Sequence, residues 1–268
     1  APPRGATEPG SRRAGIMFSY EGKKAIVTGG GRGIGKVYAQ ALAEAGARVA
    51  IGDIAAEEVQ DTAREINDGG GEAIALATDI ADEAACNSLA AAAVDTYGGI
   101  DALINNASLM SALERRPWHK IPVEEWDRVM AVNLRGMFLC CQAVYPHMKE
   151  RGGGKIVNIS SSRFWEGSPG RLHYSTSKAG VIGFTRSLAR EVGTDNIAVN
   201  AITPGFTLSD TQEATTTPEH IEASLKGRTF QRAQMPDDLV GTVMFLLSEA
   251  SDYITGQTIN VDGGKSMH

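Results

Sequence analysis

The chain has little of what disulfide-rich or membrane proteins need. Three cysteines, Cys86, Cys140 and Cys141, form no CxxC pair, and an odd number is a poor disulfide framework, so we expect a reducing, cytoplasmic setting. No stretch approaches the roughly 20 apolar residues that span a bilayer, and the beginning of the chain lacks the apolar core of a secretory signal. We therefore expect a soluble protein with no membrane partner.

Positive charge is also scarce. The chain has 26 Lys and Arg against 32 Asp and Glu, a formal net charge of -6. Nucleic-acid binders usually carry a basic patch, so we expect no nucleic-acid partner. The five histidines stand singly, without the spacing of metal ligands, and we expect no metal site.

Residues 1–16 are rich in Pro, Gly, Arg and Ala and show no periodicity. We expect them to be a disordered leader that lies outside the folded domain. An organelle transit peptide is the weaker alternative, because Glu8 and the Pro and Gly residues do not suit an amphipathic helix. No linker, repeat or charge block divides residues 17–268, which favours one domain.

From residue 24 onward, short β-branched runs alternate with longer helical stretches, a pattern typical of βαβ units. The expected strands are residues 24–29, 48–53, 72–77, 101–105, 155–160, 197–202 and 257–261, and the expected helices are 34–45, 55–67, 82–96, 124–149, 174–192 and 237–248. The pattern predicts an α/β domain with a seven-stranded parallel sheet and helices on both faces. Residues 206–235 show weak periodicity between Pro204-Gly205 and Pro236, so we expect a substrate-loop insertion there, either a lid or a mobile loop.

A glycine-rich turn, TGGGRGIG at residues 28–35, connects the first expected strand to the first expected helix. Glycines let the backbone approach a pyrophosphate, whose charge is favoured at the positive end of the following helix. Gly29, Gly33 and Gly35 form GxxxGxG, not a strict GxGxxG, so an ordinary tight turn stays open as the alternative.

Asp53 ends the second expected strand, roughly 20 residues after the glycine turn, where an acid that binds the adenosine ribose is expected. A carboxylate there repels a 2'-phosphate and so favours NAD over NADP. A helix N-cap is a compatible alternative for Asp53. Arg32 acts in the opposite direction, because a guanidinium can hold the 2'-phosphate. We predict NAD, with NADP less favoured.

Tyr174 and Lys178 form the candidate acid–base pair. Oxidation of an alcohol needs a base for the hydroxyl proton, and a tyrosine with a pKa near 10 needs help to act as one. The two residues are four apart in an expected helix, so the ammonium can favour the phenolate. Ser161 follows an expected strand at the sheet edge that binds ligands in parallel sheets. A solvated helix face is the alternative for the pair.

These patterns, with NNAS at 105–108, VNL at 132–134, SSS at 160–162, YSTSK at 174–178 and PG at 204–205, resemble the short-chain dehydrogenase/reductase family over residues 20–264. The resemblance implies a doubly wound Rossmann domain that holds both cofactor and substrate. It also implies assembly through the long helices, so we expect a homotetramer. Ser108 departs from the family, which usually has glycine after Asn-Asn-Ala.

The resemblance further implies roles for single residues. The family spacing to Tyr174 selects Ser161, over Ser160 and Ser162, as the donor to the substrate oxygen. Lys178 would also bind the nicotinamide ribose, and Asn133 would hold a water that links Lys178 to solvent. The cofactor contacts expected in this way are Gly29, Arg32, Gly33, Ile34, Gly35, Asp53, Asp79, Ile80, Asn106, Ala107, Tyr174, Lys178, Pro204, Gly205 and Thr207.

The residues that flank the catalytic positions are mostly apolar or aromatic. The candidate substrate-pocket residues are Leu109, Met110, Arg163, Phe164, Trp165, His173 and Phe206. Such a lining predicts a hydrophobic or aryl secondary alcohol or ketone, although Phe164 and Trp165 fit the core equally well. Within the family the sequence resembles NAD-dependent secondary-alcohol dehydrogenases of the phenylethanol type. A 3-oxoacyl-thioester reductase, acting on a carrier protein or CoA, is one alternative, and an inactive dinucleotide-binding sensor or scaffold is another.

Overall fold

The computed structural model describes residues 18–213 and 216–267, and the expected leader lies outside these ranges. Seven strands form one sheet in the order β3-β2-β1-β4-β5-β6-β7, and every neighbouring pair is parallel. The strands are β1 Lys24–Thr28, β2 Arg48–Asp53, β3 Glu72–Ala77, β4 Ala102–Asn105, β5 Gly154–Ile159, β6 Ile197–Pro204 and β7 Thr258–Val261. Each one falls on an expected strand, so the predicted α/β class and sheet are confirmed.

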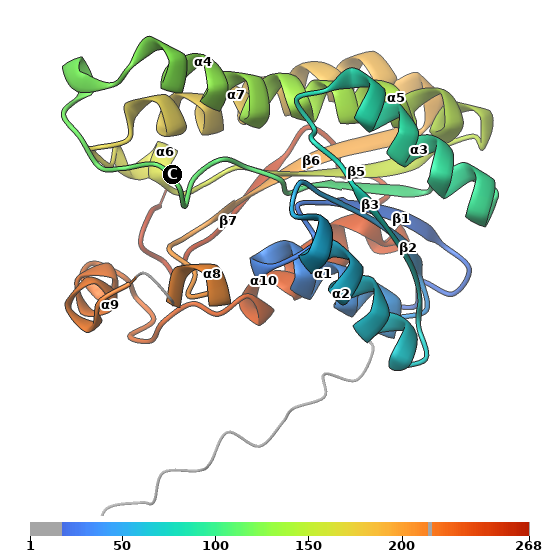
Figure 1. Ribbon diagram of the computed structural model, residues 1–268, viewed down its shortest axis with the longest axis horizontal. Coiled ribbons are helices and arrows are strands. Elements are labelled where there is room, and N and C mark those ends of the chain that lie inside the picture. The colour runs from blue at the N-terminus through green and yellow to red at the C-terminus, as the bar shows by residue number, and fades with distance from the viewer. Residues whose placement is uncertain (1–17, 214–215, 268) are drawn as a thin grey trace, which may run out of the picture.

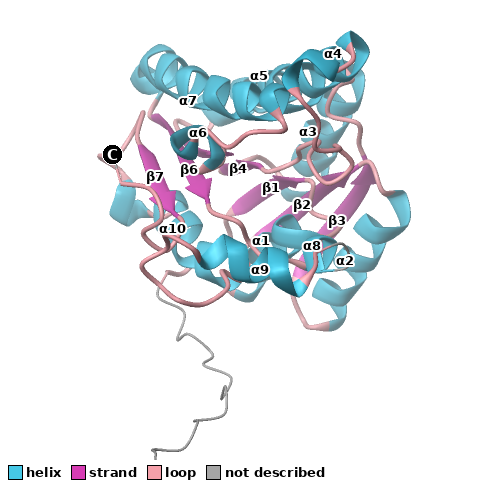
Figure 2. Cartoon of the chain, turned by 90° about the vertical axis from the view of Figure 1, so that its left-hand side faces the viewer, coloured by secondary structure: helices cyan, strands magenta, loops and turns pink. Residues whose placement is uncertain are grey.

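Helices cover both faces of the sheet and make a three-layer molecule (Figures 1 and 2). One layer contains α1 Gly33–Glu44, α2 Ala56–Asp68 and α10 Asp237–Leu247, and the other contains α3 Glu83–Tyr97, α4 Val123–Met130, α5 Met137–Glu150 and α7 Leu172–Val192. The shorter helices are α6 Arg163–Glu166, α8 Asp210–Glu213 and α9 Pro218–Leu225, with 3-10 turns at Trp118–Lys120, Gly193–Asp195 and Glu249–Ser251. Of the helices in the described part of the chain, none is long and apolar enough to cross a bilayer.

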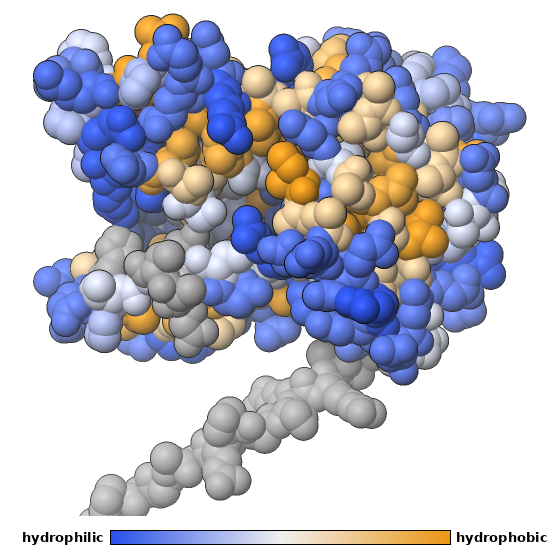
Figure 3. Space-filling model, in the orientation of Figure 1, coloured by the Kyte–Doolittle hydropathy of each residue, from blue (hydrophilic) through white to orange (hydrophobic). Residues whose placement is uncertain are grey.

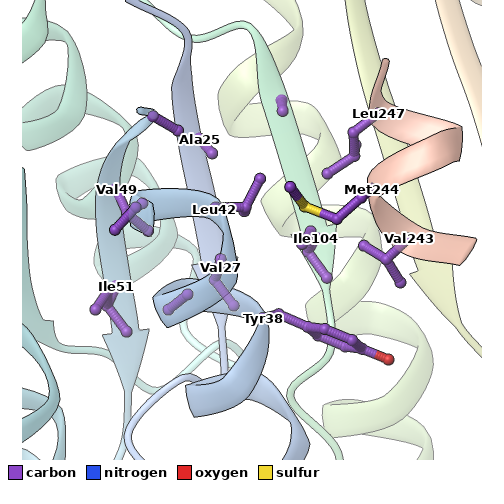
Figure 4. Close-up of a cluster of buried hydrophobic side chains, with 14 of the residues drawn as sticks. Ala25, Val27, Tyr38, Leu42, Val49, Ile51, Ile104, Val243, Met244 and Leu247 are labelled. Carbon is purple, nitrogen blue, oxygen red and sulfur yellow. The ribbon is translucent and has the colours of Figure 1, made fainter. Parts of the chain in front are cut away.

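The sheet separates two hydrophobic clusters, because a parallel sheet with helices on both faces buries its strands on both sides. All eight residues of β6 are buried. Under α1 and α10, side chains such as Tyr38, Leu42 and Met244 pack on residues of β1 and β2 (Figure 4). On the opposite face, α3 packs on β1 and β2, α5 on β4 and β5, and α7 on β5 and β6, through residues such as Leu89 and Val144. The two clusters fix the positions of the strand ends.

Two expectations differ from the structure. The helix expected at 124–149 is two helices joined by a π-helical turn at Ala131–Gly136, which contains Asn133. Such turns often occur at functional sites. The segment 206–235, expected to be irregular, contains α8 and α9, and Thr207 forms an isolated parallel bridge with Gln234. Short helices of this size carry too little periodicity to be recognised in the sequence.

The strand order places a crevice at the carboxyl edge. The chain leaves β1 toward one side and β4 toward the other, so the loops that follow these two strands separate, and ligands bind at such a point. The turn after β1 is the glycine turn, and Asn106 follows β4. The sheet topology therefore brings the glycine turn next to the loop that follows β4.

Candidate active site

A cavity of about 820 Å³ runs along the carboxyl ends of the strands. Its walls come from the glycine turn, from the ends of β2 and β3, from the loops after β4, β5 and β6, and from the segment that contains α8 and α9. Figure 3 shows the molecular surface hollowed where the layer of α4 and α6 faces the layer of α8 and α9. Residues far apart in the sequence meet in this cavity.

The glycine turn is too close-packed for side chains. A Cβ atom on Gly35 would lie 2.0 Å from the carbonyl oxygen of Gly29 and 2.4 Å from Nδ2 of Asn106. Gly29 has φ +65, and a Cβ there would lie 2.7 Å from Cα of Ala107. Nδ2 of Asn106 donates to the carbonyl oxygen of Gly29 (2.9 Å), which supports the turn from β4. The turn leaves room for a pyrophosphate at the N-terminus of α1, as the dinucleotide fold requires.

Asp53 ends β2 with its carboxylate at the cavity wall. Oδ2 accepts a hydrogen bond from the amide of Gly31 (2.9 Å) and Oδ1 accepts one from the amide of Ala55 (3.0 Å). The N-cap of α2 is Ala55, so Asp53 orders the turn before that helix and is not its N-cap. Ile54, the next residue, is 65% exposed and lines the cavity without adding a positive charge. These residues fit the adenosine end of a dinucleotide.

Most of the other expected cofactor contacts also line the cavity. The residues that do so are Gly29, Arg32, Gly33, Ile34, Asp53, Asp79, Ile80, Asn106, Ala107, Tyr174, Pro204, Gly205 and Thr207. Gly35 and Lys178 do not line it: Gly35 packs beneath the turn, and Lys178 is 3% exposed behind Tyr174.

Tyr174 lies in the first turn of α7 and is 7% exposed at the cavity wall. Burial raises the pKa of its phenol, and a hydrogen bond with Ser161 and the positive charges of Arg163 and Arg171 act against that rise. The two serines beside Ser161 are used elsewhere, since Ser160 donates to the carbonyl of Lys178 (2.7 Å) and Ser162 donates to Glu166 (2.7 Å). The structure therefore places Ser161 beside the phenol.

Lys178 is buried next to the ring of Tyr174. Its Nζ donates to the carbonyl oxygen of Ile159 (2.8 Å) and lies 5.7 Å from the ring centroid of Tyr174. Burial lowers the pKa of Lys178 to about 7. That its ammonium favours the phenolate stays a prediction, and the positive charges of Arg163 and Arg171 act in the same direction by lowering the pKa of Tyr174.

Asn133 joins the π-helical turn to the loop after β4. Its Oδ1 accepts from the amide of Leu109 (2.8 Å), and its Nδ2 donates to Oγ of Ser177 (3.0 Å). The hydroxyl of Ser108, the residue that departs from the family pattern, also donates to Asn133 (3.3 Å). Asn133 therefore positions the loop and α7, and its expected contact with a water next to Lys178 stays a prediction.

The expected substrate residues divide into two groups. Leu109, Met110, Arg163 and Phe206 line the cavity, whereas Phe164, Trp165 and His173 do not. The rings of Phe164 and Trp165 pack against each other (4.6 Å), outside the cavity. His173 is fully buried, and its Nε2 lies 3.1 Å from the carboxylate of Glu125. Adjacent residues in a helix point about 100° apart, so when Tyr174 faces the cavity His173 points away from it.

Charged residues of the cavity were missed in the sequence. Arg115, Arg171 and Lys265 line it. Arg171 precedes Tyr174 by three residues, and that spacing in a helical segment indicates the same face, so a signal was present. Arg115 and Lys265 lie on irregular segments, where no periodicity points to a shared site.

Comparisons with known proteins agree with this geometry. Residues 29–266 match the family model described as Enoyl-(Acyl carrier protein) reductase. The chain is 40% identical over 251 residues to the (2S)-((R)-hydroxy(phenyl)methyl)succinyl-CoA dehydrogenase subunit BbsD of Thauera aromatica, covering 93% of this chain and 99% of that protein. It is 38% identical over 254 residues to a 3-oxoacyl-(acyl-carrier-protein) reductase of Synechocystis sp., covering 94% and 100%.

A solved structure is similar over the same length. The 7α-hydroxysteroid dehydrogenase in complex with NADH and 7-oxo glycochenodeoxycholic acid aligns with a TM-score of 0.88 and 34% sequence identity, covering 94% of this chain and 98% of that chain. Each of these three relatives is named for a hydroxyl group or the corresponding oxo group. The chain therefore belongs to the short-chain dehydrogenase/reductase family of oxidoreductases, which act on a CH–OH group or the corresponding ketone.

Proposed function

We propose that the protein transfers a hydride between NAD(H) and a secondary alcohol or ketone, acting as an NAD-dependent alcohol dehydrogenase or ketone reductase. The observation that carries the proposal is that Tyr174 and Ser161 line the same cavity as the glycine turn and Asp53. A dinucleotide in the turn and a substrate at the phenol would therefore meet within one cavity.

The side chains have separable roles in this reaction. The nicotinamide, when bound, accepts or supplies the hydride. Ser161 donates a hydrogen bond to the substrate oxygen, and Tyr174 takes the hydroxyl proton in oxidation or returns it in reduction. Arg163 and Arg171 stabilise the phenolate through their charges. Lys178, whose pKa lies at about 7, exchanges a proton near neutral pH and lies behind the phenol.

The preference for NAD rests on Asp53. Its carboxylate is held in place by two backbone amides, so it cannot turn away from a 2'-phosphate without losing both hydrogen bonds. Arg32 is exposed at the N-terminus of α1 and is the one cation of the turn itself. The solved relative that contains NADH supports the same preference.

The test is a panel of secondary alcohols and ketones assayed with NAD(H) and NADP(H). We expect Tyr174→Phe to lower kcat by on the order of 100- to 10,000-fold while NADH still binds, measured by nicotinamide fluorescence. Tyr253→Phe is the matched control, because the side chain of Tyr253 is 104% exposed and does not pack in the core. Asp53→Ser should shift activity toward NADP. Equal inactivity of wild type and Tyr174→Phe, with NADH bound to both, would instead support the scaffold alternative.

A 3-oxoacyl-thioester reductase is the second candidate, and the 38% identity to a 3-oxoacyl-(acyl-carrier-protein) reductase favours it. Reduction of acetoacetyl-CoA with NADPH tests it, and a rate above that of every simple ketone would replace the first proposal. The phenylethanol-type, aryl substrate belongs to the first proposal, and 1-phenylethanol and acetophenone represent it in the panel.

We also propose a homotetramer assembled through α4, α5, α7, α10 and β7, in a reducing, cytoplasmic setting. Phe138 on α5 is 46% exposed, and a partner subunit would cover it. All three cysteines are free thiols in the described structure, which suits a reducing compartment. Light scattering coupled to size-exclusion chromatography tests the assembly, and a monomer would contradict it.

A further inference from the structure

Three arginines line the cavity on the substrate side of Tyr174. Arg115 comes from the loop after β4, Arg163 begins α6 and Arg171 immediately precedes α7. The positive charge of Arg115 disfavours the charged forms of Arg163 and Arg171. The charges of Arg163 and Arg171 in turn favour the phenolate of Tyr174. Two guanidinium groups thus lie near the reacting hydroxyl, and that of Arg115, from a third segment, lies in the same cavity close enough to act on both.

Neutral groups hold two of these guanidinium groups in place. Arg171 donates through Nε to the carbonyl oxygen of Leu113 (2.9 Å), and Arg163 donates through Nη2 to the carbonyl oxygens of Ser168 (3.1 Å) and Pro169 (2.9 Å). Within residues 18–213 and 216–267, none of the ion pairs involves Arg115, Arg163 or Arg171. In the described part of the chain these three guanidinium groups therefore make no direct ion pair, and among the carboxylates only the more distant Glu166, which also lines the cavity, favours the charged form of Arg163.

The nearby carboxylates are used by other cations. Glu166 pairs with Lys265 (3.1 Å) and accepts from Ser162 and Ser168. Glu125 pairs with Arg116 (3.4 Å), which is next to Arg115 in the sequence but does not line the cavity. Gathering like charges in a partly buried site is unfavourable unless an anion offsets them. The cavity thus has an excess of positive charge at the place where the substrate binds.

We infer that Arg115, Arg163 and Arg171 form a subsite for a carboxylate of the substrate, so that the enzyme acts on a hydroxy acid or oxo acid. The guanidinium fork matches the two oxygens of a carboxylate, whereas a hydrophobic ketone offers these charges no anionic partner. The apolar residues Leu109, Met110 and Phe206 in the same cavity accommodate the carbon skeleton. This inference rests on the proposed function, and it replaces the purely hydrophobic substrate expected from the sequence.

The test compares each substrate with its neutral analogue. A series of aryl and alkyl 2-oxo, 3-oxo and 4-oxo acids is reduced in parallel with their methyl esters, and the ratio of kcat/KM for acid over ester is the readout. We expect Arg171→Gln and Arg115→Gln each to lower this ratio by on the order of 10- to 100-fold, the size of a charge-assisted hydrogen bond. Any effect of Arg171 on Tyr174 is common to acid and ester and cancels in the ratio. Arg115 is exposed, so its variant keeps the fold.

Arg116→Gln is the matched control, because Arg116 carries the same charge on the same loop outside the cavity. It should leave the ratio unchanged. A second readout needs no turnover: isothermal titration with benzoate and succinate, against benzamide and succinamide, measures carboxylate binding to wild type, Arg171→Gln and Arg116→Gln. Binding lost only in Arg171→Gln supports the subsite.

The outcomes separate the subsite from the proposed function. If ketones are reduced but esters are used as well as acids, the function stands and the subsite is refuted. If no substrate is turned over but carboxylates bind in an Arg171-dependent manner, the subsite stands and the function is refuted. If Arg116→Gln lowered the acid–ester ratio as much as Arg171→Gln does, the effect would come from the overall charge of the protein, and the subsite would be refuted.

Discussion

Lys178 gives the strongest prediction for the pH dependence of stability. Its pKa is about 7 in the folded protein against an ordinary value of 10.5, because burial disfavours the ammonium. Between these two pH values the unfolded chain binds a proton that the folded protein does not. Lowering the pH through this range therefore favours unfolding, and the effect levels off below about pH 7. At pH values above 10.5 neither state is protonated and the effect disappears.

The magnitude follows from the same pKa difference. A separation of about 3.5 pH units corresponds to about 5 kcal/mol at about 1.36 kcal/mol per unit, and about 3.5 kcal/mol of it falls between pH 10 and pH 7. We expect Lys178→Met to lack this dependence. Its free energy of unfolding, taken relative to wild type, should rise by about 3.5 kcal/mol as the pH is lowered from 10 to 7.

Urea denaturation of the protein without cofactor, at one-unit steps from pH 7 to pH 10, measures this difference. Subtracting the two curves removes every group that Lys178→Met and the wild type share. The loss of the hydrogen bond to Ile159 shifts the whole difference but does not change its slope. Lys36→Met, at an exposed ion pair with Glu65, measures the general effect of losing a lysine. Parallel curves for Lys178→Met and wild type would refute the reasoning.

Three further predictions concern the turn, the phenol and the loop. Gly35→Ala should lower the free energy of unfolding, measured by urea denaturation, by about 1–3 kcal/mol or more, because its Cβ would meet a carbonyl oxygen at 2.0 Å. Gly183→Ala is the control and should not destabilise the fold, because its Cβ would meet nothing within 4 Å. Equal effects of the two variants would contradict the packing argument. Arg171→Gln should move the pH midpoint of alcohol oxidation to higher pH, because losing the positive charge raises the pKa of Tyr174; an unchanged or lower midpoint argues against this role. Asn133→Ala should lower the free energy of unfolding by about 1–3 kcal/mol through its lost hydrogen bonds, and an unchanged thermal midpoint would show that the loop does not need it.

The strands and the glycine turn could be predicted from the sequence because their signals are local. Runs of β-branched residues mark strands that are buried on both faces, and Gly29 and Gly35 occur where any side chain would collide with the neighbouring backbone. Ser161 was selected through a spacing, and the structure places it beside Tyr174. These features depend on residues that are near one another along the chain.

Other features could not be predicted because they depend on how distant segments meet. His173 and Tyr174 are adjacent, yet one is buried against Glu125 and the other faces the cavity, and only the packing of α7 decides which. The π-helical turn at Ala131–Gly136 interrupts what appears in the sequence as one continuous helix, and it lets Asn133 reach Leu109 and Ser177.

By itself, the sequence determined the sheet and the glycine turn and indicated the residues proposed for the acid–base chemistry, since periodicity and short motifs encode them. The tertiary structure decided which charges surround the phenol. It placed Arg163 and Arg171 near Tyr174 and left Lys178 bonded to a backbone carbonyl. Electrostatic interaction depends on distance and burial, not on sequence spacing, and so the character of the substrate cavity emerges only when the chain is folded.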